Sequence, residues 1–240
     1  MKETTRILIL ESSTEVCSVA LSVNGRLIDL KEDRKGQNHA RLLTTFIEQV
    51  LAANKVTPGD IDAVAVSMGP GSYTGLRIGV SAAKGFCYAG HIPLIAVSTL
   101  KAMALKVIRD FSEKVFPPEG KPLFCPMMDA RRMEVYTCLL DQNGTEVEPV
   151  SAKIITEGSF YDELQENPIV FFGNGAMKCK AKLSHPNALF LDDVYASAAW
   201  MCEPAYGAYT KKHFEDVAYF EPFYLKDFVA TIPKNNVIGK

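Results

Sequence analysis

The stretch Met68-Gly-Pro-Gly-Ser-Tyr-Thr-Gly-Leu-Arg-Ile-Gly79 joins a short apolar run to an amphipathic segment through a glycine-rich loop. The run at residues 61–67 has the length and the branched side chains of a buried strand. After the loop, apolar residues recur at helical spacing, at Leu76, Val80, Ala83 and Cys87. Because Ser72 is placed to cap this helix, the stretch predicts a strand, a loop and a helix whose free amides favour an anion.

The glycines of this stretch leave two interpretations open. Glycines in such loops can serve only for positive φ or close packing, and the loop lacks the lysine of a Gly-x4-Gly-Lys-Ser/Thr phosphate loop. Gly75 and Gly79, followed by Ala82 and Ala83, leave one helix face almost without side chains. This small-residue stripe favours close approach of another backbone, and a subunit interface is one candidate for it.

Length and composition exclude several classes of protein. The chain has 240 residues, 48% of them hydrophobic and 22% charged, with a formal net charge of -2. These values are typical of a soluble chain with one large or two small domains, and they give no overall attraction to nucleic acid or acidic membranes. The first apolar run, residues 7–10, ends at Glu11 and is too short for a signal or a membrane span. We expect a cytoplasmic protein without membrane contact.

Cysteine and histidine give no sign of a disulfide framework or a metal site. The six cysteines lie mostly inside apolar runs and never form Cys-x-x-Cys, which predicts reduced core residues. The four histidines have no common ligand spacing. We therefore expect no metal.

A repeat divides the chain. The acid that closes the first strand and the following Asn-Gly turn are 13 residues apart in the first half, from 11 to 24, and 14 apart in the second, from 129 to 143. The proline-rich residues 116–122 separate the two halves. The pattern predicts an α/β fold of two duplicated lobes, residues 1–115 and 116–240, each a mixed sheet flanked by helices.

Several elements follow from local patterns. Asn38 is predicted to cap a helix that ends near Asn54. Helical patterns cover residues 155–166 and 193–212, the second with Pro204 dividing or kinking it. The aromatic segment 221–225 is expected to pack back onto one of the lobes.

Two acids close the first strands of the two halves. Glu11 and Asp129 would point into a cleft between the lobes, near glycine turns, where a carboxylate can hold a metal–phosphate or orient water. Equally, each acid can cap its own hairpin through turn amides, and both interpretations stay open.

Five segments in the same order resemble a known family along nearly the whole chain: the TsaB (YeaZ) accessory subunits of bacterial tRNA threonylcarbamoyladenosine synthesis, within the actin-like ATPase and sugar-kinase superfold. The segments are Glu11-Ser-Ser-Thr-Glu-Val-Cys-Ser-Val-Ala-Leu21, Gly69-Pro-Gly-Ser-Tyr-Thr-Gly-Leu-Arg-Ile-Gly79, Ala96-Val-Ser-Thr-Leu100, Asp129-Ala-Arg-Arg-Met-Glu-Val-Tyr136 and Glu221-Pro-Phe-Tyr-Leu225.

The resemblance implies two actin-like, sugar-kinase-like lobes and a non-catalytic scaffold or activating subunit. It would bind the larger catalytic paralogue TsaD, which transfers a threonylcarbamoyl group to adenosine 37 of tRNAs reading codons that begin with A. A small ATPase, TsaE, completes the complex, and tRNA is met indirectly. TsaD carries a His-x-x-x-His metal pair where this chain has Thr99 and Met103, so the resemblance implies no catalytic residue, metal or cofactor here, with ATP or ADP at the joint interface as the alternative.

The resemblance also assigns surfaces. The helices at residues 39–53 and 73–89 would face TsaD, or pair two copies of this chain when TsaD is absent. The partner-binding candidates are Leu42, Phe46, Gly75, Leu76, Gly79, Val80 and Ala83, although a core role is the default for each apolar residue. Candidates for holding a nucleotide are Glu11, Ser12, Gly71, Ser72 and Asp129.

Departures and alternatives remain. Family members usually have Asp at position 11 and often Gly at position 133; Glu11 reaches further and Met133 would crowd a cleft, so both weaken nucleotide binding.

The alternatives are a stand-alone ATPase or phosphotransferase that uses Glu11 or Asp129, and a glycoprotease-like hydrolase that uses Ser12, Ser13 or Ser72. Candidate phosphate contacts, or else solvated surface, are Arg131, Arg132, Lys211 and Lys212.

Overall fold

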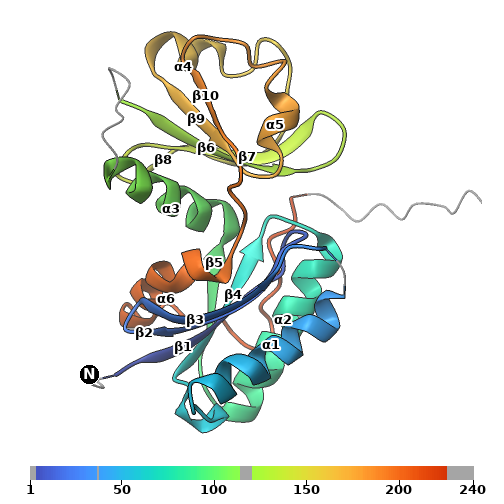
Figure 1. Cartoon of the computed structure of the whole chain (residues 1–240), viewed down its shortest axis with the longest axis vertical. Helices are drawn as coiled ribbons and strands as arrows, with labels where there is room; N and C mark the ends of the chain where they lie inside the picture. Colours follow the sequence, from blue (N-terminus) through green and yellow to red (C-terminus); the bar gives the residue numbers. More distant parts are fainter. Residues whose placement is uncertain (1–3, 37, 114–120, 226–240) are drawn as a thin grey trace, which may run out of the picture.

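The first half of the chain forms a five-stranded sheet with two helices on one face (Figure 1). The computed structural model describes residues 4–36, 38–113 and 121–225. The elements are β1 (Arg6–Glu11), β2 (Cys17–Val23), β3 (Arg26–Asp33), α1 (His39–Ala53), η1 (Pro58–Asp60), β4 (Ala63–Gly69), α2 (Tyr73–Gly90), β5 (Leu94–Ser98) and α3 (Thr99–Glu113). The strand order is β3-β2-β1-β4-β5, with β1 antiparallel to β2 and parallel to β4.

The second half repeats this topology. Its elements are β6 (Leu123–Asp129), β7 (Glu134–Leu140), β8 (Glu146–Ile154), α4 (Tyr161–Glu166), β9 (Ile169–Phe172), α5 (Ala176–Cys179), β10 (Ala188–Leu191), η2 (Ala198–Met201) and α6 (Cys202–Thr210). The order β8-β7-β6-β9-β10 matches the first sheet strand for strand, and β6 is again antiparallel to β7 and parallel to β9. The predicted α/β duplication is therefore confirmed.

Two helices pack against the sheet of the other half. The apolar face of α3, at Leu100, Met103 and Val107, packs on the second sheet against Phe124 and Phe172. In exchange, η2 and α6 cover the first sheet through Ala198, Met201, Cys202 and Ala205. The division at 115/116 stays a prediction, since the helices on either side of it cross over and residues 114–120 lie outside the described part.

The predicted helices of the second half are shorter than their patterns. Residues 155–160 precede α4 without helix, with turns at residues 157–160, and residues 192–197 connect the lobes without helix. Pro204 does not divide a helix, because it lies in the first turn of α6. Backbone N–H groups in the first turn make no hydrogen bond within the helix, so a proline there breaks none. Asn38 precedes α1 as predicted, but it adopts φ 64° and its side chain makes no cap hydrogen bond.

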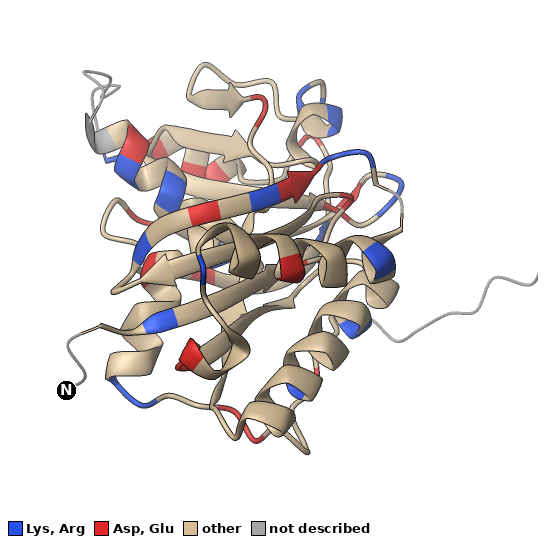
Figure 2. Cartoon of the chain, turned by 60° about the horizontal axis from the view of Figure 1, so that its bottom comes forward, with Lys and Arg blue, Asp and Glu red and all other residues tan. Residues whose placement is uncertain are grey.

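Charge and burial follow the fold. Acidic and basic residues are interspersed over the chain (Figure 2). The six cysteines are buried and free, which confirms the predicted core role.

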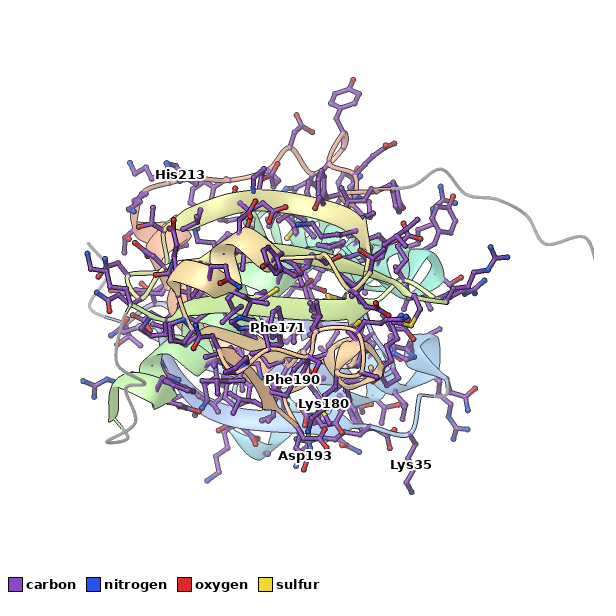
Figure 3. All side chains as sticks on the ribbon, turned by 90° about the horizontal axis from the view of Figure 1, so that it is seen from above. Lys35, Phe171, Lys180, Phe190, Asp193 and His213 are labelled. Carbon is purple, nitrogen blue, oxygen red and sulfur yellow. The ribbon has the colours of Figure 1, made fainter. Side chains whose placement is uncertain are left out.

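In the second lobe, the rings of Phe171 and Phe190 stack with centroids 5.2 Å apart (Figure 3). Among the described residues, no helix combines the length and apolarity that a membrane crossing requires.

The aromatic tail packs on the first lobe. The Phe223 amide donates to the Met68 carbonyl oxygen at 2.8 Å, and Phe220 joins the first lobe's core. The Tyr224 ring lies 5.0 Å from that of Tyr73, centroid to centroid. Residues 226–240 lie outside the described part of the chain.

Candidate functional site

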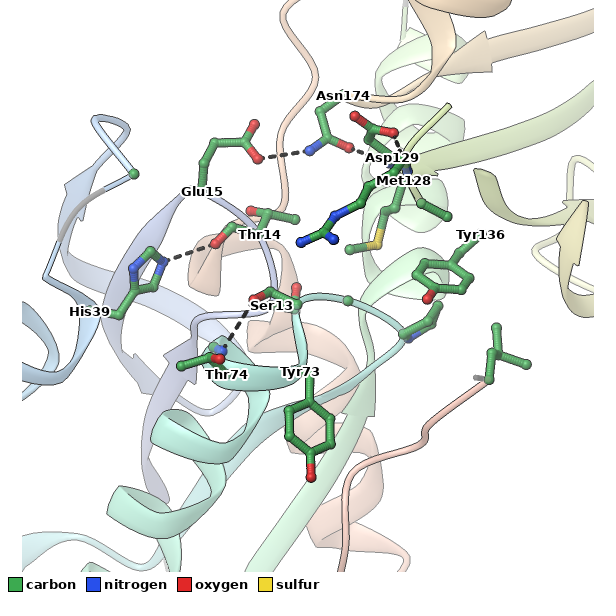
Figure 4. Close-up of a pocket in the computed structure, with 18 of the residues that line it drawn as sticks. Ser13, Thr14, Glu15, His39, Tyr73, Thr74, Met128, Asp129, Tyr136 and Asn174 are labelled. Carbon is green, nitrogen blue, oxygen red and sulfur yellow. Dashed lines mark hydrogen bonds between the residues drawn. The ribbon is translucent and has the colours of Figure 1, made fainter. Parts of the chain in front are cut away.

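A cavity of about 1040 Å³ lies between the two lobes (Figure 4). Its first-lobe wall is the β1–β2 turn, the starts of α1 and α2, and the glycine loop before α2. Its second-lobe wall is residues 128–132, Glu134 and Tyr136 around the β6–β7 turn, together with Asn174, and the tail at residues 223–225 closes one side.

The predicted strand, loop and helix at residues 61–79 are confirmed, and the glycines have a direct geometric cause. Ser72 caps α2, its side chain accepting from the Gly75 amide at 3.3 Å. A Cβ added to Gly71 would lie 2.4 Å from the Ser13 carbonyl oxygen, and one added to Gly75 would lie 2.1 Å from that of Ser12. The α2 start therefore packs directly on the backbone of the β1–β2 turn.

The small-residue stripe faces this chain itself. A Cβ on Gly79 would lie 2.4 Å from the Ser12 Oγ, and that hydroxyl donates to the Gly75 carbonyl oxygen at 2.8 Å. As surface contacts, the candidates on this face need correction because the chain's own core covers them: Gly75, Leu76, Gly79, Val80 and Ala83. Leu42 and Phe46 are half-buried and stay predictions.

Glu11 does not reach the cavity. It is buried and accepts from the Ser13 amide at 2.6 Å, so it stabilises its own turn. Burial raises the pKa of the Glu11 carboxyl, against the opposing effect of hydrogen bonds from Ser13. A carboxyl without access to solvent cannot hold a phosphate-bound metal in the cavity, and the extra methylene is accommodated by the core.

Asp129 lines the cavity but is already paired. Its Oδ1 lies 2.5 Å from the Lys178 Nζ and accepts from the Arg131 amide at 2.8 Å. Lys178 also donates to the carbonyl oxygens of Arg132 and Glu134, both at 2.7 Å. This lysine fixes the β6–β7 turn, where Arg131 and Arg132 both adopt positive φ.

Sequence reasoning missed the residues that join the two walls. The Asn174 Nδ2 donates to the Glu15 Oε2 at 2.8 Å across the lobes. Within the first-lobe wall, the His39 Nε2 lies 2.9 Å from the Thr14 carbonyl oxygen. The available signal was the duplication, because the glycine loop at residues 173–175 follows β9 as the loop that begins at Pro70 follows β4, whose last residue is Gly69.

Thr99 and Met103, the positions at which the resemblance implies no metal pair, lie in an apolar interior. Thr99 and Met103 are 1% and 2% exposed, and Met103 packs with the core under α3. No group of three His, Cys, Asp or Glu able to hold a metal occurs among the described residues. Met133 packs on the second lobe's core, so the expectation that it crowds the cleft is wrong.

Two of the three candidate serine nucleophiles, Ser12 and Ser13, are buried. The Ser12 hydroxyl is used by Gly75, and the Ser13 side chain is buried beside Glu11. Burial raises the pKa of the Cys87 thiol to about 11 and that of Cys17 to about 12. Ser12, Ser13 and these thiols are therefore not set up to attack a substrate. Ser72 differs from them, because it is exposed in the cavity wall and its hydroxyl accepts from the Gly75 amide at 3.3 Å.

The basic candidates separate into two places. Arg131 and Arg132 line the interlobe cavity, whereas Lys211 and Lys212 follow the end of α6 and do not. Arg77, on α2, stacks over the Tyr73 ring at 4.4 Å and contacts the Tyr224 hydroxyl at 3.3 Å.

A second hollow lies between α1 and α2. This α1–α2 groove has a volume of about 570 Å³ and is lined by Ala40, Leu43, Thr44, Tyr73, Thr74, Arg77, Ile78, Ser81 and Ala82. Ala40, Tyr73, Thr74 and Ile78 also line the interlobe cavity, so the two hollows share walls.

Comparison with known proteins agrees with this architecture. The model of the family described as TsaD, tRNA N6-adenosine threonylcarbamoyltransferase, matches residues 33–234. The TsaB protein of Haemophilus influenzae is 27% identical over 93% of this chain and 94% of its own length. That of Bacillus subtilis is 31% identical over 70% of each chain.

A solved structure supports the fold. A Pseudomonas aeruginosa crystal structure, described as similar to peptidase YEAZ, superposes with a TM-score of 0.78 at 23% identity, over 92% of this chain and 100% of that one. Together with the duplicated sheets, this likeness agrees with the predicted actin-like lobes. The chain belongs to the TsaB (YeaZ) family of tRNA threonylcarbamoyladenosine biosynthesis proteins.

Proposed function

We propose that this chain is a non-catalytic scaffold and activating subunit for threonylcarbamoylation of adenosine 37 in tRNA, and that it acts by binding TsaD. In this proposal TsaE joins the pair, tRNA is met through TsaD, and two copies of this chain use the same surface when TsaD is absent. No chemistry is assigned to this chain.

The observation that carries the proposal is the exposed α1–α2 groove. The helix α1 has 15 residues and α2 has 18, and each contains only two that are Lys, Arg, Asp or Glu. Both helices are mostly tan in Figure 2. Protein interfaces are depleted of charge at their centres and need hollows that take apolar side chains. Ile78 and Ala82 supply such a surface beside half-buried Leu42 and Phe46.

The geometry supports the non-catalytic part of the proposal as well. The first-strand acid, Glu11, is sealed under its own turn. At the positions of the TsaD metal ligands, Thr99 and Met103 are enclosed by core residues. A catalyst needs its acid, base or metal within reach of the substrate.

The test places a bulky charge in the groove. Ser81→Arg fills the α1–α2 groove from an exposed position, and Thr210→Arg makes the same change at the exposed end of α6, on the other face of the first sheet. Each variant is expressed with TsaD for co-purification, and each is used to rescue cells depleted of this chain. Mass spectrometry then measures threonylcarbamoyladenosine in their tRNA.

We expect Ser81→Arg to lose TsaD and fail to restore the nucleoside, while Thr210→Arg behaves as the unaltered protein. Full TsaD binding by Ser81→Arg would contradict the assigned surface. Unchanged nucleoside levels in the depleted cells would contradict the proposed function itself.

A second candidate is an ATPase or nucleotide-binding role for the interlobe cavity, alone or at the joint interface. Its volume of about 1040 Å³, the start of α2 and the pair Arg131 and Arg132 favour a phosphorylated ligand. ATP turnover by the purified chain, lost in an Asp129→Ala variant, would support it. No turnover in a metal-replete assay would dispose of the stand-alone activity.

A further inference from the structure

Two loops from opposite lobes meet in the lining of the interlobe cavity. Figure 4 shows Glu15 and Asn174 pointing toward one another, and the Asn174 Nδ2 donates to the Glu15 Oε2 at 2.8 Å. A hydrogen bond to a charged carboxylate is stronger than one between neutral groups. The proposed function does not use this contact.

The asparagine end of the bridge is held rigidly. The Asn174 Oδ1 accepts from the Asp129 amide at 3.0 Å, which leaves the Nδ2 to face the carboxylate, an acceptor only. A Cβ added to Gly173 would lie 2.4 Å from the Met127 carbonyl oxygen, and one added to Gly175 would lie 2.9 Å from the Asp129 nitrogen. The two glycines therefore let this loop lie against the end of β6, so the amide has a fixed position.

The glutamate end is tied to both helices of the α1–α2 groove. Glu15 belongs to the β1–β2 turn, in which the Ser13 carbonyl oxygen accepts from the Ser72 amide at 2.7 Å, next to the start of α2. In the same turn, the Thr14 carbonyl oxygen lies 2.9 Å from the Nε2 of His39, the first residue of α1. A force on Glu15 therefore reaches the starts of both helices.

Other contacts between the halves lie along α3, the connecting segment at residues 192–197, η2 with α6, and the tail. Arg109 of α3 lies 3.6 Å from the Glu203 carboxylate of α6, and the Lys106 ammonium lies 4.7 Å from the centre of the Trp200 ring. Ser197, in the connecting segment, donates to Glu32 at 2.5 Å. These contacts can act as a hinge for a rotation that widens the cavity, whereas the bridge spans the cavity itself.

We propose that the Glu15–Asn174 bridge is a clasp that sets the separation of the two lobes, and through the shared walls the shape of the α1–α2 groove. The first part concerns the isolated chain. The second part, that the clasp adjusts the surface offered to TsaD, rests on the proposed function. Glu15 and Asn174 are positioning residues in this scheme.

The test measures the lobe separation directly. Spin labels are attached at Lys35→Cys, beside the β1–β2 turn, and at Met177→Cys, on α5. Figure 3 shows Lys35 extending outward, Met177 is 40% exposed, and the buried native cysteines compete poorly for the label. Asn174→Asp then places a second carboxylate against Glu15, and Gln142→Glu makes the matched change at an exposed turn of the second lobe.

We expect Asn174→Asp to lengthen and broaden the label distance, because two carboxylates repel at this range. Adding Glu15→Gln should restore the distance, because a glutamine amide can donate to Asp at position 174. Gln142→Glu should leave it unchanged. An unaltered distance in Asn174→Asp, or the same change in the control, would overturn the clasp.

The coupling to the groove is measured separately by TsaD binding. Because the bridge is exposed to solvent, its loss corresponds to about a two- to fivefold change in an equilibrium constant. We expect about that loss of affinity in Asn174→Asp, with recovery in the double variant. If the lobes separate but affinity is unchanged, the coupling is overturned. The proposed function would survive that result, because Ser81→Arg tests it through a residue outside the clasp.

Discussion

Gly75→Ala is the sharpest test of the contact between α2 and the β1–β2 turn. The added Cβ would lie 2.1 Å from the Ser12 carbonyl oxygen, against an ordinary contact of at least 3.4 Å. The helix and the turn must therefore separate by more than 1 Å. The atom in the way belongs to the backbone, so rotation of a side chain cannot relieve the clash. The separation also stretches the 2.8 Å hydrogen bond from the Ser12 hydroxyl to the Gly75 carbonyl oxygen.

The expected magnitude follows from three effects. Overpacking costs about 1–3 kcal/mol, and the strained buried hydrogen bond adds about 1 kcal/mol. The helix propensity of alanine over glycine offsets about 1 kcal/mol. We expect a net loss of about 2 kcal/mol in the free energy of unfolding, and a melting temperature about 4–8 °C lower for a chain of this size.

Gly85→Ala is the matched control on the same helix. A Cβ at Gly85 would meet nothing within 4 Å, so only the propensity effect remains and the free energy of unfolding should rise by about 0.5–1 kcal/mol. Urea and thermal unfolding, followed by circular dichroism, compare the three proteins. Equal shifts of the same sign in both variants would refute the close-packing argument.

Three further outcomes follow from single contacts. Burial raises the pKa of Glu11 above its ordinary 4.5, so above pH 4.5 the folded state keeps a proton that the unfolded state releases. The free energy of unfolding therefore falls as the pH rises from 4.5 to the raised pKa. Glu11→Gln should remove this part of the slope in a pH series of urea midpoints; an identical slope would contradict the assignment. Gly79→Ala should destabilise less when Ser12→Ala removes the hydroxyl 2.4 Å from the new Cβ, so a double-mutant cycle without coupling would contradict that contact. Ser72→Ala should cost about 1 kcal/mol, whereas Asn38→Gly should cost nothing measurable in thermal unfolding, because Asn38 has φ 64° and no side-chain cap bond.

Local sequence determined the elements whose signals are short-range. The type I′ turn at Asn24-Gly25 has φ 50° and 80°, as a two-residue hairpin requires. The Ser72 cap and the glycine loop could be predicted for the same reason, because neighbouring residues determine them. The duplication was readable as well, since both halves carry an acid and an Asn-Gly turn at nearly equal spacing.

Tertiary structure decided what the residues singled out from the sequence contact. The small-residue stripe at Gly75 and Gly79 indicated close backbone approach. Only the fold identifies that backbone as the chain's own turn at Ser12 and Ser13. Ser12, which donates to Gly75, lies 63 residues before it in the sequence. Glu11 likewise closes its strand as predicted, yet its direction depends on packing around it. Periodicity gives a helix an apolar face without naming what covers that face.

The sequence by itself therefore determined the strand–loop–helix unit, the duplicated α/β organisation and the family resemblance. It did not determine that α3 and α6 exchange sheets, or that Glu15 meets Asn174 across 159 positions. Such contacts depend on the relative placement of two lobes, which arises from many weak interactions summed over distant segments. No local pattern encodes that sum, so only the folded chain reveals the cavity, its clasp and the groove beside it.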